Sequence, residues 1–251
     1  MLIQILSWTM NIKWLDGADP QLILNEIEEE LIKKGLVFFK NIRSIANYKN
    51  LINLIGNIIP HRDSDETGLT AIRDVQNDSL GYRGFSNHSL SLHTDRSCLV
   101  RPPLIMTGWF SQTSANGGEN IFLDGYQLYR LLLKHYVDIL SILVCEQNIF
   151  NDQNNYSINP IFEKLNHNRM IIRYRNDDYV KFGKQTAQHI PLLDEIMINQ
   201  AFEIKFNKFE GFILNNTRVL HGRKSFLGKR EVFRSFVDPL NIKLEAGFSI
   251  N

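Results

Sequence analysis

Apolar residues in the first third of the chain follow first a helical and then a strand-like period. They recur at helical spacing from Leu24 to Leu31, between a helix start at Asp19 and a glycine, Gly35, suited to end the helix. The run GLVFFKNI that follows is apolar and rich in β-formers, so it predicts a strand. A second short helix is expected over residues 47–55.

The rest of the chain is dominated by short segments with a strand-like pattern. A polar, aperiodic stretch over 60–87 comes first and predicts a long loop, and long ordered loops tend to carry function. Helices are expected over 126–135, where Asp124 can cap the first turn, and over 191–200. Strands are predicted in seven segments: LSLHTD, LIMTGWFSQ, ENIFLDG, RMIIRYR, FEIKF, FILNNT and REVFRSFVD.

Many short strands with a few helices favour an α+β fold. The expected core is a jelly roll, or double-stranded β-helix, with helices packed on its flanks. No internal repeat, low-complexity tract or linker-like change in composition divides the sequence. Residues 1–251 are therefore expected to form a single domain.

The composition excludes several classes of protein. The 251 residues are 43% hydrophobic and 22% charged, which is ordinary for a globular chain and unlike disordered or fibrous proteins. The formal net charge of +1 gives no reason to expect a nucleic acid or a membrane as partner. The sequence shows no apolar run of membrane-spanning length, no segment typical of a secretory signal and only two cysteines. A cytoplasmic protein is therefore expected.

Three residues together indicate a metal site. His93 and Asp95 form an H-x-D pair, and on a strand two side chains at this spacing point to the same face. His221 follows 128 positions later in NNTRVLHGR. Two histidines and one carboxylate are the facial triad of non-haem iron(II) oxygenases, which leaves the opposite face of the metal open.

Arg234 lies 13 positions after His221, on a predicted strand. Its planar guanidinium matches a carboxylate with two hydrogen bonds. At this place it would hold the far carboxylate of a 2-oxo diacid whose other end binds the metal. An ordinary surface ion pair is the alternative interpretation.

Four motifs in order give the sequence a family resemblance. HTDRS is followed by PPLIM, then by GGENIFLDG, NNTRVLHGR and KREVFRSFVD. This succession resembles the TauD/TfdA-like iron(II)/2-oxoglutarate dioxygenases of the clavaminate synthase-like group, and it extends over roughly residues 35–239. The family pattern has an H-x-D, a Gly-Gly-x-Thr segment, a distal histidine and an arginine shortly beyond it.

The resemblance implies roles for particular residues. His93, Asp95 and His221 match the iron ligands, and Arg234 matches the arginine that pairs with the 2-oxoglutarate C5 carboxylate. Arg230 matches a basic residue often found four positions earlier. Asn120 stands where many members have the threonine that binds the co-substrate, and its amide can still donate to a carboxylate.

The resemblance also implies the reaction. Such an enzyme uses Fe(II), 2-oxoglutarate and O2, releases succinate and CO2, and hydroxylates an unactivated C–H bond of its substrate. Asp95 favours hydroxylation over halogenation, because related halogenases have a small residue in place of this carboxylate. Desaturation and cyclisation in specialised-metabolite biosynthesis stay open. So do a catalytically inactive jelly-roll binding protein and a zinc hydrolase, although hydrolysis would not explain Arg234.

Clues to the substrate are few. Arg83 and Asn87 lie in the loop before the H-x-D pair, and Arg96 follows Asp95 directly. Arg173 and Arg175 share a face if RMIIRYR is a strand, and Arg173 would then hold a substrate carboxylate. The expected partner is a small polar molecule, possibly a free amino acid. Solvated charges on an edge strand are the alternative, and the oligomeric state is left open.

Overall fold

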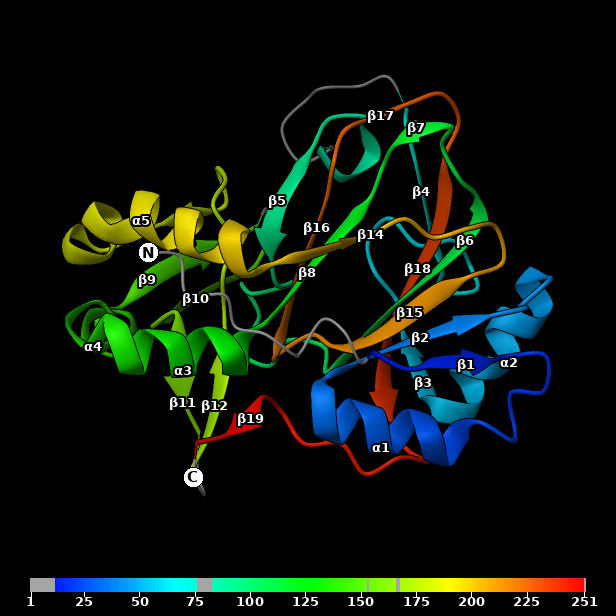
Figure 1. Cartoon of the computed structure of the whole chain (residues 1–251), viewed down its shortest axis with the longest axis horizontal. Helices are drawn as coiled ribbons and strands as arrows, with labels where there is room; N and C mark the ends of the chain where they lie inside the picture. The colour runs from blue at the N-terminus through cyan, green and yellow to red at the C-terminus, as the bar shows by residue number, and fades with distance from the viewer. Residues whose placement is uncertain (1–11, 76–82, 153, 166–167, 251) are drawn as a thin grey trace.

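The computed structural model describes residues 12–75, 83–152, 154–165 and 168–250 (Figure 1). The strands of its largest sheet are β1 (Trp14–Asp16), β2 (Leu36–Lys40), β3 (Gly56–Ile59), β4 (Thr70–Arg73), β6 (Ile105–Gln112), β15 (Gly211–Asn215) and β18 (Glu231–Pro239). Their order is β1-β2-β15-β6-β18-β3, and β4 also pairs with β18. All pairs are antiparallel except β1 with β2.

A second sheet of four strands packs against the first. It consists of β14 (Phe202–Ile204), β8 (Asn120–Asp124), β16 (Val219–Arg223) and β5 (Leu90–His93), in that order. Phe122 and Val219 of this sheet join one buried cluster with Phe38, Phe110 and other side chains of the larger sheet. The next residue on β16, Leu220, belongs instead to a cluster on the opposite face. The alternation therefore gives β16 an inner face toward the larger sheet and an outer face.

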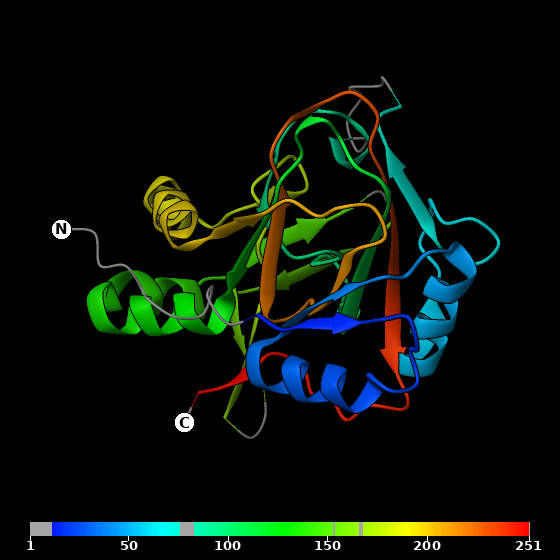
Figure 2. The ribbon, with the colours of Figure 1, turned by 45° about the vertical axis from the view of Figure 1, so that its right-hand side comes forward.

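Helices cover the outer faces of both sheets (Figures 1 and 2). The larger sheet packs its outer apolar side chains against α1 (Leu24–Lys34) and α2 (Ile45–Ile55). The four-stranded sheet packs against α3 (Gly125–His135), α4 (Val137–Cys145) and α5 (Lys184–Gln200). No helix in the described part of the chain is long and apolar enough to cross a membrane.

Three small sheets complete the structure. One pairs β17 (Phe226–Leu227) with β7 (Asn116–Gly117). Another has β9 (Asn148–Asn151) between β10 (Tyr156–Asn159) and β13 (Val180–Lys181), and the third has β12 (Arg169–Ile172) between β11 (Phe162–Lys164) and β19 (Phe248–Ser249). A 3-10 turn spans Arg83–Phe85.

The mixed α+β class predicted from the sequence is confirmed, while some boundaries differ. Helix α1 ends at Gly35, which adopts φ 73° as its C-cap, but it begins at Leu24 because Asp19 caps a preceding turn. Helix α5 begins at Lys184 rather than at residue 191, with Pro191 inside it. The apolar run that forms α4 was not predicted, and the expected loop over 60–87 contains β4 and the 3-10 turn.

Candidate active site

The two histidines of the triad lie side by side on paired strands. His221 of β16 and His93 of β5 are register partners in the four-stranded sheet. Their ring centroids are 4.3 Å apart. The sequence places them 128 positions apart, so it is the antiparallel pairing of β16 with β5 that brings them together.

Asp95 reaches the histidines from a turn and not from the strand. The prediction that His93 and Asp95 share a strand face is wrong, because β5 ends at His93. Asn216 holds the turn: its Oδ1 accepts from the Asp95 backbone N–H at 2.9 Å, and its Nδ2 donates to the Asp95 carbonyl at 2.9 Å. The next residue, Arg96, has φ 58°. This turn places Asp95 Oδ1 3.5 Å from His93 Nε2 and Oδ2 3.7 Å from His221 Nε2.

The three side chains form a donor set that fits a metal ion. Their potential ligand atoms all lie within 4.8 Å of one another. His93 Nδ1 lies 2.8 Å from the Ser91 carbonyl, an arrangement in which Nδ1 carries the proton and Nε2 keeps a free lone pair. His221 Nδ1 is buried and has no hydrogen-bond partner among the residues that the structure describes.

The protonation states of Asp95 and His221 also suit metal binding. Burial alone would raise the pKa of Asp95, but the charge of Arg234 and the contact with His93 hold that pKa well below its usual range. Burial, followed by the neighbouring His93, lowers the pKa of His221 to about 3. The carboxylate is therefore ionised and His221 is neutral near pH 7, as metal ligands require.

Two pockets meet at the triad. The inner pocket lies between the two sheets, where Phe122 and Phe212 contribute apolar wall, and it extends from His221 to Arg230 and Asn120. The outer pocket is lined mainly by charged and polar residues, among them His61, Asp63, Asp95, Asp152 and Asp178. Both are lined by His93 and Arg234, so the candidate metal site lies in the wall that they share.

Arg230 and Asn120 stand at the end of the inner pocket away from the triad. Arg230 donates to Asn120 Oδ1 at 3.1 Å, and its guanidinium lies over the rings of Phe110 and Phe226. Burial, followed by the nearby charge of Arg223, lowers the pKa of Arg230 to about 9. No described carboxylate forms an ion pair with it, so this end of the pocket favours an anion.

Arg234 stands at the other end, beside the triad. Its terminal nitrogen donates to Asp95 Oδ2 at 3.0 Å, and its guanidinium carbon lies 5.0 Å from the Phe236 ring centre. Its Nε is buried without a partner. Val232 of β18 stands between Arg230 and Arg234 in the sequence, and all three residues line the inner pocket.

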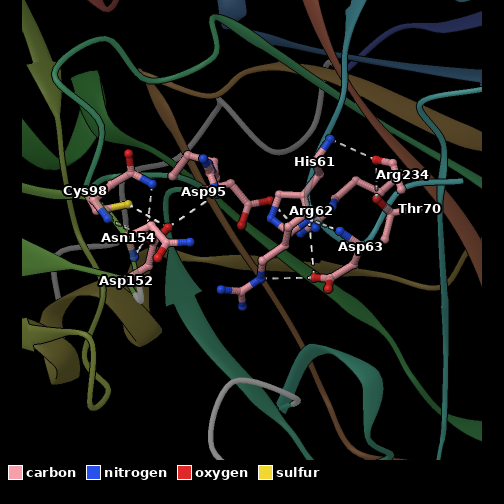
Figure 3. A network of polar contacts seen from close by, with 12 residues as sticks. His61, Arg62, Asp63, Thr70, Asp95, Cys98, Asp152, Asn154 and Arg234 are labelled. Atoms are coloured by element: carbon pink, nitrogen blue, oxygen red, sulfur yellow. Dashed lines mark hydrogen bonds and ion pairs between the residues drawn. The ribbon is translucent and has the colours of Figure 1, made fainter. Parts of the chain in front are cut away.

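Ion pairs surround the outer pocket. Asp152 accepts from Arg96 at 3.3 Å and from the Cys98 thiol at 3.2 Å, and Figure 3 shows this group on one side of Asp95. The residues that Figure 3 labels on that side are Cys98, Asn154 and Asp152, and on the other side it shows His61, Arg62, Asp63 and Arg234. Charges of both signs therefore face one small space.

His61 and Arg175 are among the pocket residues that the sequence analysis did not select. His61, which lacks a sequence motif, lines the outer pocket, and burial, followed by the charge of Arg234, lowers its pKa to about 4. Arg175 lines the same pocket and pairs with Asp177 at 2.5 Å. The sequence carries no local signal for His61. Arg175 lies two positions after Arg173, which the sequence analysis selected to hold a substrate carboxylate.

The predicted substrate residues are scattered. Arg96 lines the outer pocket. Arg173 does not line this pocket. It is 2% exposed, and its guanidinium donates to Glu163 and to the carbonyls of Ser97, Leu99 and Val100. That prediction is wrong because β12 ends at Ile172, so the strand alternation does not continue to Arg173. Asn87 lines neither pocket, and the side chain of Arg83 lies outside the described structure.

Solved structures share the fold at low sequence identity. A putative alpha-ketoglutarate-dependent taurine dioxygenase from Burkholderia xenovorans is 15% identical, with a TM-score of 0.71 over 95% of this chain and 93% of that one. PvcB from Pseudomonas aeruginosa is 15% identical, with a TM-score of 0.69 over 96% and 92%. An asparagine oxygenase in complex with Fe(II), 2S,3S-3-hydroxyasparagine and succinate is 12% identical, with a TM-score of 0.67 over 90% and 80%.

Sequence comparison at the family level gives the assignment. No curated protein sequence matches the chain. The model of the family described as "Taurine catabolism dioxygenase TauD, TfdA family" matches residues 6–236, which is most of the chain. The chain therefore belongs to the TauD/TfdA family of iron(II)- and 2-oxoglutarate-dependent dioxygenases.

Proposed function

We propose that this chain hydroxylates an unactivated C–H bond of a small zwitterionic molecule, such as a free amino acid or a derivative, and releases succinate and CO2. One observation carries the proposal: the His93–Asp95–His221 triad lies in a wall between two pockets of different chemistry. We further propose that the two facing sheets are the jelly-roll core of a single domain.

The triad would hold the iron through Nε2 of each histidine and the carboxylate of Asp95. Bound iron and 2-oxoglutarate supply the oxidation of the C–H bond by O2. The protein contributes orientation and charge. Ser91 fixes the ring of His93, Asn216 fixes the turn of Asp95, and the guanidinium of Arg234 keeps that carboxylate ionised.

Arg230 and Asn120 are the better candidates for the far carboxylate of 2-oxoglutarate. They stand at the end of the inner pocket away from the triad, and Arg230 has no carboxylate partner there. The side-chain oxygen of Asn120 accepts a hydrogen bond from Arg230. The side-chain NH2 of Asn120 is therefore left as a second donor for the bound acid. Arg234, for which the family pattern suggested this role, is engaged by Asp95 and also faces the outer pocket.

The outer pocket fits a substrate with one acidic and one basic group. Arg234 lines this pocket, and its guanidinium offers a donor to the acidic group. The imidazole of His61, neutral near pH 7, faces the same pocket. Asp178 is exposed and has no ion-pair partner in the described structure, so it is available to an amine. The asparagine oxygenase structure shows that this fold accommodates amino-acid hydroxylation.

A matched substrate screen tests the proposal. Protein supplied with Fe(II) and 2-oxoglutarate is incubated with free amino acids and with the corresponding acids that lack the amine. We expect succinate formation above the substrate-free rate with an amino acid, and a product heavier by one oxygen atom. Preference for the amine-free acids would reject the zwitterion. A His221→Ala variant as active as the unmodified protein would reject the oxygenase.

A further inference from the structure

Every carbonyl group of the loop formed by residues 84–88 accepts a hydrogen bond. Arg223 donates to three of them: Gly84 at 3.4 Å, Ser86 at 2.7 Å and His88 at 2.5 Å. The backbone N–H of Phe226 donates to Asn87 at 3.0 Å, and that of Val75 donates to Phe85 at 2.8 Å. All five carbonyls of the 84–88 loop thus have donors, and one guanidinium supplies three of them.

This arginine connects the two pockets. Arg223 lies two residues after His221 on β16 and lines the inner pocket. In the 84–88 loop, Gly84 and Phe85 line the outer pocket, and Gly84 lines both. The side chain that faces the proposed 2-oxoglutarate site therefore also fixes part of the wall of the proposed substrate site.

The charge of Arg223 is only partly compensated: burial lowers its pKa to about 10, and the negative charge of Asp74 offsets part of that effect. Its guanidinium lies 4.9 Å from the ring centre of Phe226, and that of Arg230 lies 5.6 Å from the same centre. After burial, the charge of Arg223 is the next cause that lowers the pKa of Arg230, and Arg223 Nε is buried without a partner among the described residues. The positive guanidiniums of Arg223 and Arg230 repel each other because both lie over the ring of Phe226. A carboxylate that binds between them reduces this repulsion.

We propose that Arg223 is a positioning residue that couples 2-oxoglutarate binding in the inner pocket to the order of the 84–88 loop in the outer pocket. This inference rests on the proposed function. A carboxylate beside Arg230 compensates the charge of Arg223 as well, and Arg223 then holds its three carbonyls more firmly. Because such coupling is reciprocal, an ordered loop also tightens the hold on 2-oxoglutarate.

Hydrogen–deuterium exchange of the peptide spanning 84–92 measures the coupling directly. Protein loaded with Fe(II) under anaerobic conditions is compared with and without 2-oxoglutarate, and the visible absorption band of the complex reports binding. We expect exchange to slow by about fivefold or more in the unmodified protein, the lower end of ordinary coupling between sites. In Arg223→Lys the band should form, but exchange should not slow, since Arg223 reaches the three carbonyls from two separate nitrogens and lysine has only one.

Arg218→Lys is the matched control. Arg218 is also buried and donates to the carbonyls of Ile32 and Lys33 and to Asp124, but it lines neither pocket. This variant should lose thermal stability and keep the slowing. If Arg223→Lys does not fold, Phe226→Leu replaces it: the ring beneath both guanidiniums is lost, and the slowing should shrink.

The outcomes separate this inference from the proposed function. Absence of the band in the unmodified protein overturns both. A band with no slowing in the unmodified protein overturns the coupling alone. Equal slowing in the unmodified protein and in Arg223→Lys assigns the coupling to another residue and overturns the role of Arg223.

Discussion

Arg234 donates to Asp95 Oδ2 at 3.0 Å, and the same oxygen lies 3.7 Å from His221 Nε2. One guanidinium thus touches a candidate metal ligand while it lines both pockets. Arg230, four residues earlier, lies at the far end of the inner pocket and bonds Asn120. From this geometry we expect the two arginines to have different tasks.

Replacement of Arg230 should weaken 2-oxoglutarate binding selectively. Arg230→Met removes a charged donor from a buried site, so the Kd for 2-oxoglutarate should rise on the order of 10- to 100-fold. Anaerobic titration of the iron-loaded protein measures this, and iron binding itself should be unchanged. A Kd within about twofold of the original would place the far carboxylate elsewhere.

Replacement of Arg234 should affect the amino-acid substrate rather than 2-oxoglutarate. Arg234→Lys keeps a positive charge beside Asp95 but loses the planar fork. We expect 2-oxoglutarate binding to stay within about threefold, whereas the stimulation of succinate formation by an amino acid should be lost. The reverse pattern in the two variants would show that Arg234, and not Arg230, holds the co-substrate.

Arg173 should matter for stability and not for substrate binding. Arg173→Met leaves Glu163 and three backbone carbonyls without their buried donor, and it should lower the free energy of unfolding by about 3 kcal/mol. Urea denaturation measures this. Arg175→Met is the control: it breaks a more exposed pair with Asp177, so it should cost less than about 1 kcal/mol but weaken substrate binding. Equal losses of stability would contradict this assignment.

The two cysteines should differ in reactivity. Burial, together with the hydrogen bond to Asp152, raises the pKa of Cys98 to about 11, whereas Cys145 is exposed. The reactive thiolate of Cys98 is scarce at pH 8, and its labelling rate should rise roughly tenfold per pH unit up to the pKa. Mass spectrometry after brief iodoacetamide treatment at pH 8 should find label on Cys145 alone. Rapid labelling of Cys98 at pH 8 would show that its side chain is open to solvent.

The sequence was most informative where the chemistry is local. The H-x-D pair and the distal histidine could be predicted, and so could helices that end at a glycine, such as α1 at Gly35. His61 could not be found, because it reaches the pocket from a turn after β3 that carries no motif. Arg173 was chosen on strand alternation, which ends at Ile172. Boundaries of this kind depend on tertiary contacts that a periodic pattern does not contain.

The measurement that tests the account most directly is an anaerobic optical titration of metal-free protein with Fe(II) and 2-oxoglutarate. We predict a weak visible band that requires both components, disappears in His221→Ala and persists in His135→Ala, since His135 is exposed at the end of α3. A folded protein that binds iron but shows no band with 2-oxoglutarate, or a band that survives in His221→Ala, would contradict the metal and co-substrate site.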